Sequence, residues 1–375
     1  MKASRGEVKA YIILVNWRNP FDTIECVQSL MRLTYHNFQV VVCDNGSTDD
    51  SNGIFRAWAE RRVSLVPQAK NPTGFLASSA GQSLDPSAAF VDAENVNGVY
   101  FADPGKVTEA TPRVVFISIP KNLGFAGGNN VGLRYARERG DGGIYWLLNN
   151  DTVVDPESLS HIADKFLRDP GCGMVGATIY HYYDPLVIQY SCGATANHWL
   201  ATVSPIVTPR AINQSRTDFE VAIESRIDYV SGACLAITPD FLDRAGFMDE
   251  GYFLYYEELD WAARIPPHLH IGYAADAIVY HKEGAAIGGK TKGSSRKSLV
   301  ADRYASRSRL VFTWRWHPVR CLLVVPMILL GALRRFCSGK TKNGTAVLSG
   351  LMSGVLRLSE EGFLGMAQKR EDNEA

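Results

Sequence analysis

Long apolar runs that alternate with amphipathic patterns are the feature that most limits how this chain can fold. Residues 11–17 (YIILVNW) and 38–45 (FQVVVCDN) are almost continuously apolar or β-branched, and a helical spacing of apolar residues follows each run. Strands that are apolar on both faces must be covered on both sides, which is typical of parallel sheets flanked by helices. The pattern therefore predicts an α/β fold with a mostly parallel sheet. Further strands are expected at 113–119, 144–150, 173–182, 230–238 and 271–281, and further helices at 51–62, 128–139, 156–168 and 238–245.

Composition excludes several classes of protein. Of the 375 residues, 46% are hydrophobic and 21% are charged, which is incompatible with wholesale disorder. Lys+Arg and Asp+Glu both number 39, so the net charge indicates no partner. None of the seven cysteines forms a C-x-x-C pair, so we expect reduced thiols in a cytoplasmic protein and neither a disulfide scaffold nor a structural zinc site. Residues 1–10 carry charge and lack the apolar core of a signal peptide.

Two stretches depart from the alternation of strands and helices. Residues 67–110 are rich in Ala, Ser, Gly, Pro and Asn and show little periodicity, so we expect an irregular insertion, which is either a tolerated surface segment or a lid over a substrate. After about residue 290 the chain becomes basic and aromatic. The sequence therefore predicts an α/β domain over 1–290, followed by a basic helical region and a tail over 291–375.

The first polar motif, 44–51 (DNGSTDDS), follows a predicted strand. Ligands of open α/β sheets bind beyond the carboxyl ends of the strands, so its location makes the motif a candidate. Asp44 and Asn45 can hydrogen-bond a base or a ribose, while Ser47 and Asp49 belong to a stretch that can cap the next helix. A plain junction between strand, turn and helix is the alternative interpretation.

A glycine-rich segment, 122–130 (NLGFAGGNN), follows the predicted strand 113–119. Its glycines stand at positions 124, 127 and 128, which do not match the G-x-G-x-x-G spacing of dinucleotide-binding loops. The segment can still bring its backbone close to a nucleotide, and a packing turn is the alternative.

Possible cation ligands follow the predicted strand around 144–148. Asn149 and Asp151 are two residues apart, which is the spacing of two ligands on the same side. Their oxygens suit a hard divalent cation that bridges phosphates. His281 ends the last predicted strand, and a lone histidine there is ordinarily a hydrogen-bonded structural residue.

Three carboxylates crowd the start of a predicted helix in 251–265 (GYFLYYEELDWAARI). Glu257, Glu258 and Asp260 can simply favour the helix N-terminus electrostatically. Alternatively, carboxylates this close together in an aromatic setting raise one another's pKa, which suits a general base. The aromatic residues around them also suit the face of a sugar.

In this order and spacing, the motifs resemble those of the inverting family 2 glycosyltransferases of the GT-A fold, especially the bacterial rhamnosyltransferase-like branch. The resemblance covers about 10–285. A weaker similarity at 304–312 is to a Tyr-x-x-Arg-Asn-x-Leu signature, in which Ser308 replaces the Asn. The segments that carry the resemblance are VNW (15–17), DNGSTD (44–49), NLGFAGGNN (122–130), LLNNDT (147–152), SGACLAI (231–237), FMDEGYFLYYEELDWAAR (247–264) and His281.

The resemblance implies a nucleotide-diphosphate sugar as donor and Mg²⁺ or Mn²⁺ as cofactor. LLNNDT looks like this branch's version of the Asp-x-Asp metal motif, so Asn149, Asp151 and His281 are the implied metal or diphosphate contacts. Glu257, Glu258 and Asp260 are the implied catalytic carboxylates, and which of Glu257 and Glu258 is the base stays open. The implied donor-binding residues are Asn16, Asp44, Asn45, Ser47, Asp49, Asn122, Gly124, Phe125, Gly127, Asn149 and Asn150.

The donor and the acceptor are expected from the same resemblance. Rhamnose from dTDP-rhamnose is the first expectation for the donor. The expected acceptor is a growing polysaccharide or a lipid-linked glycan of a bacterial envelope. Two other functions are weighed: a sugar-nucleotide nucleotidyltransferase and a non-catalytic carbohydrate-binding protein of the same fold. The first would need a glycine-rich triphosphate loop after the first strand, but 15–22 (VNWRNPFD) has no glycine. The retained acidic residues argue against the second.

The C-terminal region suggests a membrane partner. Residues 296–342 hold eleven Lys or Arg and one acid, Asp302, and they include the apolar run 321–333. A basic and apolar helix is typical of proteins that lie on an anionic membrane surface, so we expect peripheral attachment to the inner face of the cell membrane. No nucleic-acid-binding motif accompanies the charge, so nucleic acid is not an expected partner. A homo-oligomer is left open.

Overall fold

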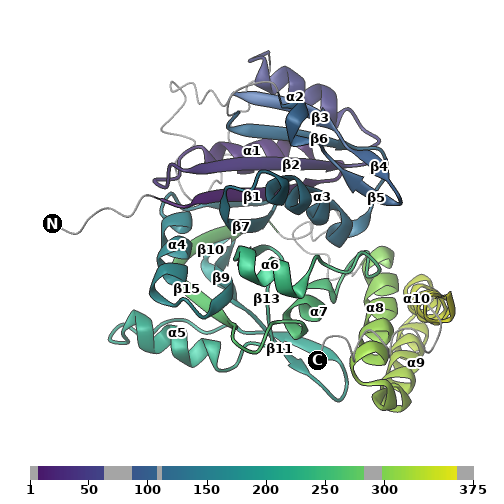
Figure 1. Ribbon diagram of the computed structural model, residues 1–375. Helices are drawn as coiled ribbons and strands as arrows, with labels where there is room; N and C mark the ends of the chain where they lie inside the picture. The colour runs from purple at the N-terminus through teal and green to yellow at the C-terminus, as the bar shows by residue number, and fades with distance from the viewer. Residues whose placement is uncertain (1–6, 63–86, 108–111, 283–297, 361–375) are drawn as a thin grey trace.

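A mixed sheet with helices on both faces forms the centre of the molecule (Figure 1). The computed structural model describes residues 7–62, 87–107, 112–282 and 298–360. Within them the main sheet has ten strands in the order β3-β6-β2-β1-β7-β14-β9-β15-β8, and β10 pairs with β9. The strands are β1 (Lys9–Asn16), β2 (Phe38–Asn45), β3 (Ala88–Asp92), β6 (Val114–Ile119), β7 (Gly142–Asn149), β8 (Thr152–Val154), β9 (Cys172–His181), β10 (Asp184–Ser191), β14 (Cys234–Ile237) and β15 (His270–His281).

Parallel pairing brings the polar motifs to one edge of this sheet. The neighbouring strands β3, β6, β2, β1 and β7 all run parallel, whereas β14 is antiparallel to both β7 and β9. In the register of β1, Asn16 lies beside Asp44 of β2, and Val15 lies beside Asn149 of β7. The α/β prediction is therefore confirmed, and the carboxyl ends of β1, β2 and β7 place three separate motifs side by side.

Successive side chains of each central strand pack alternately into two hydrophobic layers, one on each face of the sheet. In β1, Ala10, Ile12 and Leu14 pack on one face, and Tyr11 and Ile13 pack on the other. Because both faces are buried, these strands read as continuous apolar runs in the sequence. Helices α1 (Pro20–Leu30), α2 (Ser51–Ala59) and α4 (Ser158–Arg168) cover the first face; α3 (Gly124–Glu138), α5 (Arg216–Glu224), α6 (Pro239–Ala245) and α7 (Glu257–Ala263) contribute to the second.

The expected irregular insertion over 67–110 is corrected in its second half. Strand β3 pairs parallel with β6 and forms the edge of the main sheet, and β4 (Glu94–Val96) and β5 (Val99–Phe101) form a hairpin. The ring of Phe90 stacks on that of Phe116 at a centroid distance of 4.9 Å, which fastens the edge strand to the core. Residues 63–86 and 108–111 lie outside the described residues, so the first half of the expectation stays a prediction.

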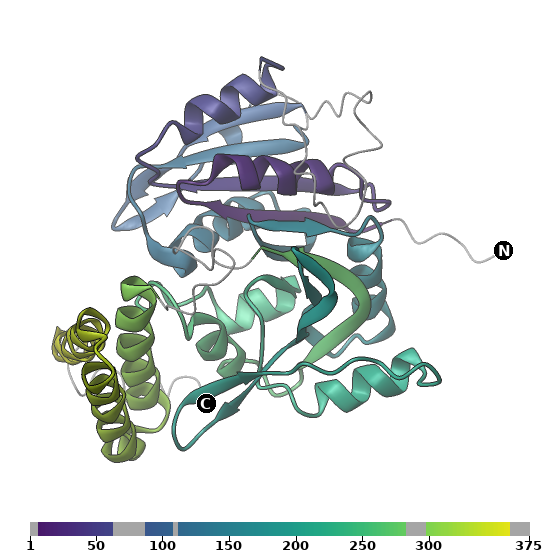
Figure 2. The same cartoon turned by 180° about the vertical axis from the view of Figure 1, so that it is seen from behind.

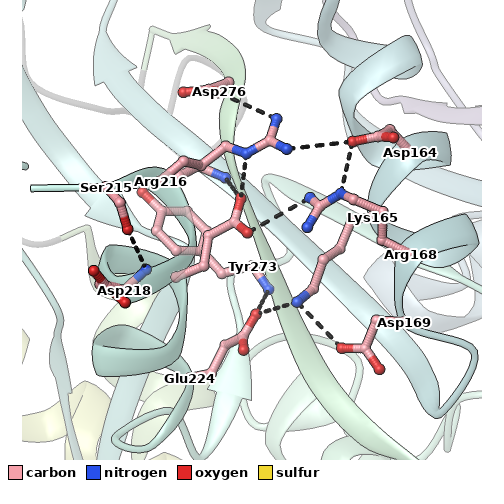
Figure 3. A network of polar contacts seen from close by, with 12 residues as sticks. Asp164, Lys165, Arg168, Asp169, Ser215, Arg216, Asp218, Glu224, Tyr273 and Asp276 are labelled. Carbon is pink, nitrogen blue, oxygen red and sulfur yellow. Dashed lines mark hydrogen bonds and ion pairs between the residues drawn. The ribbon is translucent and has the colours of Figure 1, made fainter.

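Helix α5 and a second, three-stranded sheet were not predicted from the sequence. That sheet has the order β12-β11-β13, built from β11 (Gly193–Asn197), β12 (Thr202–Pro205) and β13 (Tyr229–Val230). A polar network holds α5 against β15 (Figure 3). Glu224 accepts hydrogen bonds from the amide of Tyr273 at 2.7 Å and pairs with Lys165 of α4 at 2.7 Å, and Glu220 accepts from the amide of Ala275 at 3.1 Å.

Three C-terminal helices pack together beside the α/β domain (Figures 1 and 2). They are α8 (Leu299–Trp316), α9 (Cys321–Cys337) and α10 (Thr341–Glu360), and they share a hydrophobic cluster with residues of α7. Helix α8 lies next to the domain, and α9 and α10 lie farther out. In the part of the chain that the structure describes, every helix is too short or too polar to cross a bilayer.

Candidate active site

Three side chains named by the sequence as metal contacts meet at the carboxyl ends of β7 and β15. His281 Nε2 lies 3.2 Å from Asp151 Oδ1 and 3.3 Å from Asn149 Nδ2. The backbone amide of Lys282, the next residue, donates to the Asp151 carbonyl at 3.0 Å, which joins the two strand ends. Residues 149, 151 and 281 therefore form one group, called here the Asn–Asp–His cluster, although 130 positions separate its parts.

The Asn–Asp–His cluster fits a divalent cation. On its other side, His281 Nδ1 lies 2.9 Å from Gln189 Oε1 of β10. In the tautomer with its proton on Nδ1, His281 donates to Gln189 and leaves Nε2 available for a cation. The amide of Asn149 can present its oxygen in place of its nitrogen, since the two positions are interchangeable. Ligands on adjacent corners of an octahedron with radius about 2.1 Å stand about 3 Å apart, which matches the observed spacing.

Gln189 was not found by sequence reasoning. It is 9% exposed and lies in a strand without a clear apolar pattern, so nothing in the sequence links it to His281, 92 positions later. A residue that holds the far nitrogen of a metal-binding histidine fixes both its tautomer and its orientation. Gln189 therefore joins the candidate site as a positioning residue.

A buried charge network anchors the end of β15. The ammonium group of Lys282 contacts the carboxylates of Asp22 and Glu25 on α1, and the Tyr182 hydroxyl donates to Glu25 at 2.8 Å. Burial lowers the pKa of Lys282, but the two carboxylates raise it by more, so the net pKa is raised and the amine stays charged. This network fixes the strand end that carries His281.

A second polar group joins the carboxyl ends of β1 and β2. Asn16 Nδ2 donates to Asp44 Oδ1 at 2.8 Å, and the Ser47 hydroxyl donates to the same oxygen at 2.5 Å. Burial raises the pKa of Asp44, and the hydrogen bonds from Ser47 and Asn16 oppose that rise. Asn150 donates to Thr23 Oγ1 at 2.8 Å, and Thr23 donates to Asn16 Oδ1, so this group is continuous with the loop that carries Asp151.

The remaining residues named as donor contacts build turns around this edge. Asn45 Nδ2 donates to the Gly124 carbonyl at 2.9 Å, and Asn122 Oδ1 accepts from the Gly124 amide at 2.8 Å. Gly124 has a φ of 77° and no room for a side chain, because an added Cβ would lie 2.4 Å from the Phe253 carbonyl oxygen. Phe125 donates its amide to that same oxygen at 2.7 Å. Gly127 packs tightly on Leu123, where an added Cβ would lie 2.5 Å from its Cβ, and Asp49 accepts from Ser51 at the start of α2.

The two glutamates at the start of α7, called here the glutamate pair, have different surroundings. Glu257 is 1% exposed, and its Oε2 has no hydrogen-bond partner among the described residues. Burial and the charge of Glu258 raise the pKa of Glu257 well above its ordinary value. Glu258 is partly exposed and lies against Gly232, and burial raises its pKa to about 7.

Asp260 is set apart from the glutamate pair. Its Oδ1 accepts from the Tyr252 hydroxyl at 3.1 Å and from Arg315 Nη1 and Trp316 Nε1 at 3.0 Å each, and its Oδ2 accepts from Arg264 Nε at 3.1 Å. The side chain is fully buried. Its carboxylate is thus occupied in joining α7 to α8, which makes Asp260 a positioning residue rather than a group that meets a substrate.

One short turn connects the glutamate pair to the Asn–Asp–His cluster. The Glu258 carboxylate borders Gly232, and the next residue, Ala233, accepts a hydrogen bond from the Asn149 amide at 3.1 Å. Ala233 precedes β14, which pairs with β7. The partly exposed Glu258 carboxylate and the backbone of Asn149, in the Asn–Asp–His cluster, therefore contact the same turn, 231–233.

Known proteins are similar to this chain in sequence. The model of the family Glycosyl transferase family 2 matches residues 12–79 and 105–220. Over these residues the chain is similar to family 2 glycosyltransferases. The match supports the expected enzyme class, a glycosyltransferase, while the narrower rhamnosyltransferase branch stays a prediction.

A curated relative and two solved structures are also similar. The low-salt glycan biosynthesis hexosyltransferase Agl10 of Haloferax volcanii is 22% identical over 169 residues, which cover 45% of this chain and 52% of that protein. The chain thus spans about half the length of this relative. The mannosyltransferase PcManGT of Pyrobaculum calidifontis, solved with GDP-Man and Mn²⁺, is 11% identical over 92% of this chain and 87% of its own, with a TM-score of 0.47. S. aureus TarS 1-349 is 12% identical over 91% and 90%, with a TM-score of 0.44.

Proposed function

We propose that this protein is a metal-dependent, inverting glycosyltransferase that moves a sugar from a nucleotide-diphosphate donor to a hydroxyl of a glycan. The observation that carries the proposal is the turn 231–233, which contacts both the Glu258 carboxylate and the backbone of Asn149 in the Asn–Asp–His cluster. A Mg²⁺ or Mn²⁺ ion held by Asn149, Asp151 and His281 supplies neutralising charge for a leaving diphosphate when it is bound. Asn16, Asp44 and Ser47 lie beside this cluster, where a nucleoside would extend from the diphosphate.

Glu258 is the proposed general base. A base works best when its pKa lies near the working pH, and the pKa of Glu258 is raised to about 7. Glu258 takes the proton from the acceptor hydroxyl, whose oxygen then attacks the sugar carbon on the face opposite the diphosphate. Direct attack needs no covalent enzyme intermediate and inverts that carbon. Glu257, with a pKa well above its ordinary value, stays protonated and neutral beside the base.

The sugar and the acceptor are proposed from the motif resemblance. Rhamnose from dTDP-rhamnose is the proposed donor substrate, and a polysaccharide or lipid-linked glycan of a bacterial envelope is the proposed acceptor. Three tyrosines stand near the glutamate pair and can offer ring faces to a sugar. Burial raises the pKa of Tyr255 and Tyr229, and the nearby charges of the glutamate pair raise it further. Tyr190 is close enough to both tyrosines to raise their pKa as well.

The outer face of the C-terminal helices supports the proposed membrane partner. Helix α9 buries Val324 and Ile328, but apolar residues on its other side are exposed. Leu322, for example, is 78% exposed. The apolar face continues on α10, where Met352 is 61% exposed. The exposed apolar residues of α9 and α10 are Leu322, Leu323, Met327, Leu329, Leu330, Leu333, Leu348, Met352, Val355 and Leu356.

Several arginines in 296–342 make contacts within the protein. Arg307, Arg309, Arg315 and Arg335 direct their guanidinium groups to carbonyls or carboxylates of the protein. Much of the basic charge in 296–342 therefore holds α8 to its neighbours. Arg334, Lys340 and Lys342 are exposed at the end of α9 and the start of α10, and their charge complements an anionic lipid surface. We propose that α9 and α10 lie on the inner leaflet, with a cytoplasmic domain above them.

A donor screen tests the proposed activity. Purified protein is incubated with dTDP-rhamnose, UDP-N-acetylglucosamine or GDP-mannose, with Mn²⁺ or with chelator, and release of nucleoside diphosphate is measured. We expect one donor to be hydrolysed slowly and only with the metal, and at 100 times its Kd it should stabilise the fold by about 2.7 kcal/mol. Binding of no donor would contradict the proposal, and release of pyrophosphate from a sugar phosphate and a nucleoside triphosphate would indicate a nucleotidyltransferase.

Co-sedimentation with vesicles tests the membrane face. The full chain should pellet with phosphatidylglycerol vesicles, and less so in high salt, but not with phosphatidylcholine vesicles. Leu322→Glu combined with Leu330→Glu should abolish binding, while Val203→Glu, at an exposed position outside the C-terminal helices, should not. A concentration-dependent dimer that the paired substitution breaks, without vesicle binding, would show that a second copy covers this face.

A further inference from the structure

We propose that helix α8 is a clamp that positions the general base. It does so by holding the loop 251–256, called here the approach loop, in an unusual backbone conformation. The proposal rests on the function proposed above for Glu258. It identifies Tyr304 and Ser308, on a helix outside the family match, as positioning residues for catalysis.

The approach loop has a backbone conformation that its own sequence disfavours. Phe253, Tyr255 and Tyr256 have φ angles of 63°, 68° and 72°, and none of them is a glycine. Bulky residues rarely adopt this left-handed region, and they keep it only where surrounding structure imposes it. The loop ends at Glu257, so the direction in which α7 begins, and with it the place of Glu258, depends on this conformation.

Helix α8 supplies donors to the carbonyl groups that such a loop leaves without partners. Arg307 Nη1 donates to the carbonyls of Gly251 and Tyr252 at 2.8 and 3.0 Å. The Ser308 hydroxyl is 2.9 Å from the Leu254 carbonyl and 3.3 Å from that of Tyr252. Since buried carbonyls must be paired, these two side chains stabilise the loop in the form observed.

An aromatic contact completes the clamp. The ring of Tyr304 stacks on that of Phe253, with centroids 4.6 Å apart and planes 19° from parallel. Further along the helix, Arg315 pairs with Asp249 before the loop and with Asp260 after it. Helix α8 therefore contacts the approach loop at its start and its middle through Tyr304, Arg307 and Ser308 of the 304–312 signature, and Arg315 contacts the residues on either side of it.

The approach loop also borders the donor side of the site. The Phe253 carbonyl accepts from the Phe125 amide, and Gly124 packs directly on Phe253. By contrast, the contacts that form the Asn–Asp–His cluster come from β7, the turn that follows it, β10 and β15, with no contribution from α8 among the described residues. Loosening α8 should therefore displace Glu258 while cation binding is kept.

Paired variants of the full chain test the clamp. Tyr304→Ala and Ser308→Ala remove contacts with the loop, whereas Tyr304→Phe keeps the stacked ring, and Val300→Ala changes an exposed position on the same helix. With dTDP-rhamnose and Mn²⁺, we expect both loop variants to lower kcat by about 100-fold, as a misplacement of about 1 Å does. Mn²⁺ affinity should change by less than about threefold, and both controls should keep the kcat of the unaltered chain.

Two readouts separate positioning from a merely structural role. The acid limb of the pH–rate profile should move to lower pH in the loop variants, because a released Glu258 becomes better hydrated. Hydrogen exchange of the peptide 251–260 should quicken in Tyr304→Ala and Ser308→Ala, and not in Tyr304→Phe.

Distinct outcomes identify which proposal fails. If the unaltered chain releases no nucleoside diphosphate from any donor, the proposed function fails, and hydrogen exchange still decides whether α8 holds the loop. Unaltered exchange in both loop variants, or unchanged kcat in an active enzyme, overturns the clamp. If Tyr304→Ala unfolds altogether, Ser308→Ala, which removes only one oxygen atom, decides whether the clamp proposal holds.

Discussion

The Asn–Asp–His cluster and the glutamate pair contact the same turn, yet they are held in place by different means. The cluster sits on the ends of β7 and β15, where the sheet's own hydrogen bonds set the backbone. The glutamate pair follows a left-handed loop whose carbonyls are paired by a helix about 50 positions later. One half of the site is thus fixed by the main sheet and the other by an added helix, so the two halves should respond separately to substitution.

The largest effect is expected at the cluster. Asp151→Ala removes its only carboxylate, so we expect transfer to fall by about 10⁴-fold, because a bound metal contributes several kcal/mol. Circular dichroism should be unchanged, since the sheet pairings do not use this side chain. Turnover and Mn²⁺ binding by calorimetry are measured together, with exposed Glu157→Ala as the control. Full turnover in chelator would refute the metal role.

The next effect distinguishes the two members of the glutamate pair. Glu258→Gln removes the proposed base, so kcat should fall by about 100- to 1,000-fold while donor affinity is kept. Glu257→Gln is the matched control: Glu257 already holds its proton, so its amide replacement should keep most of the activity. Steady-state kinetics of both variants decide between them, and the reverse ranking would make Glu257 the base.

A smaller effect tests the support of the cluster. Gln189→Leu removes the acceptor that holds His281 Nδ1–H, so affinity for Mn²⁺ should weaken by about 10- to 100-fold. Titration with Mn²⁺ measures the change, and excess metal should restore activity. Unchanged affinity would mean that the β15 backbone alone orients His281.

The smallest expected effect is on stability, and it appears as a pH dependence. The folded-state pKa of Glu258, about 7, lies above its unfolded value of about 4.3, so the folded state binds more protons between these pH values. Stability should therefore decrease as pH rises from about 4.3 to 7, and this decrease should be smaller in Glu258→Gln. Melting temperatures from pH 5 to 8 measure the difference, and parallel profiles for the two proteins would contradict the raised pKa.

Sequence reasoning found what local patterns encode. The strands β1, β2 and β7 are buried on both faces and so read as continuous apolar runs, and the motifs at their ends were located correctly. Strand β3 was missed because it is an edge strand within a polar stretch. Its place in the main sheet depends on the stacking of Phe90 on Phe116. Helix α5 was missed because its glutamates act on a strand 50 positions away.

The candidate site divides in the same way. Asp151 and His281 could be named from their places at strand ends, and the structure brings them together. The sequence did not predict the contact between Asp260 and α8, because its partner Arg315 lies 55 positions later in the chain. Asn45 and Asn122 were named as donor contacts, but their side chains build the turn at Gly124, a use that residue type alone does not distinguish.

The carboxylates of α5 bear on the tendency of the protein to aggregate. Around 273–275, β15 has no second neighbouring strand among the residues that the structure describes, so its outward amides at Tyr273 and Ala275 would offer another chain a template for β-pairing. Glu224 and Glu220 occupy those amides, and Lys165 and Arg168 hold the glutamates in place. The sheet margin is thereby sealed by charged side chains, which protects the protein against edge-to-edge aggregation.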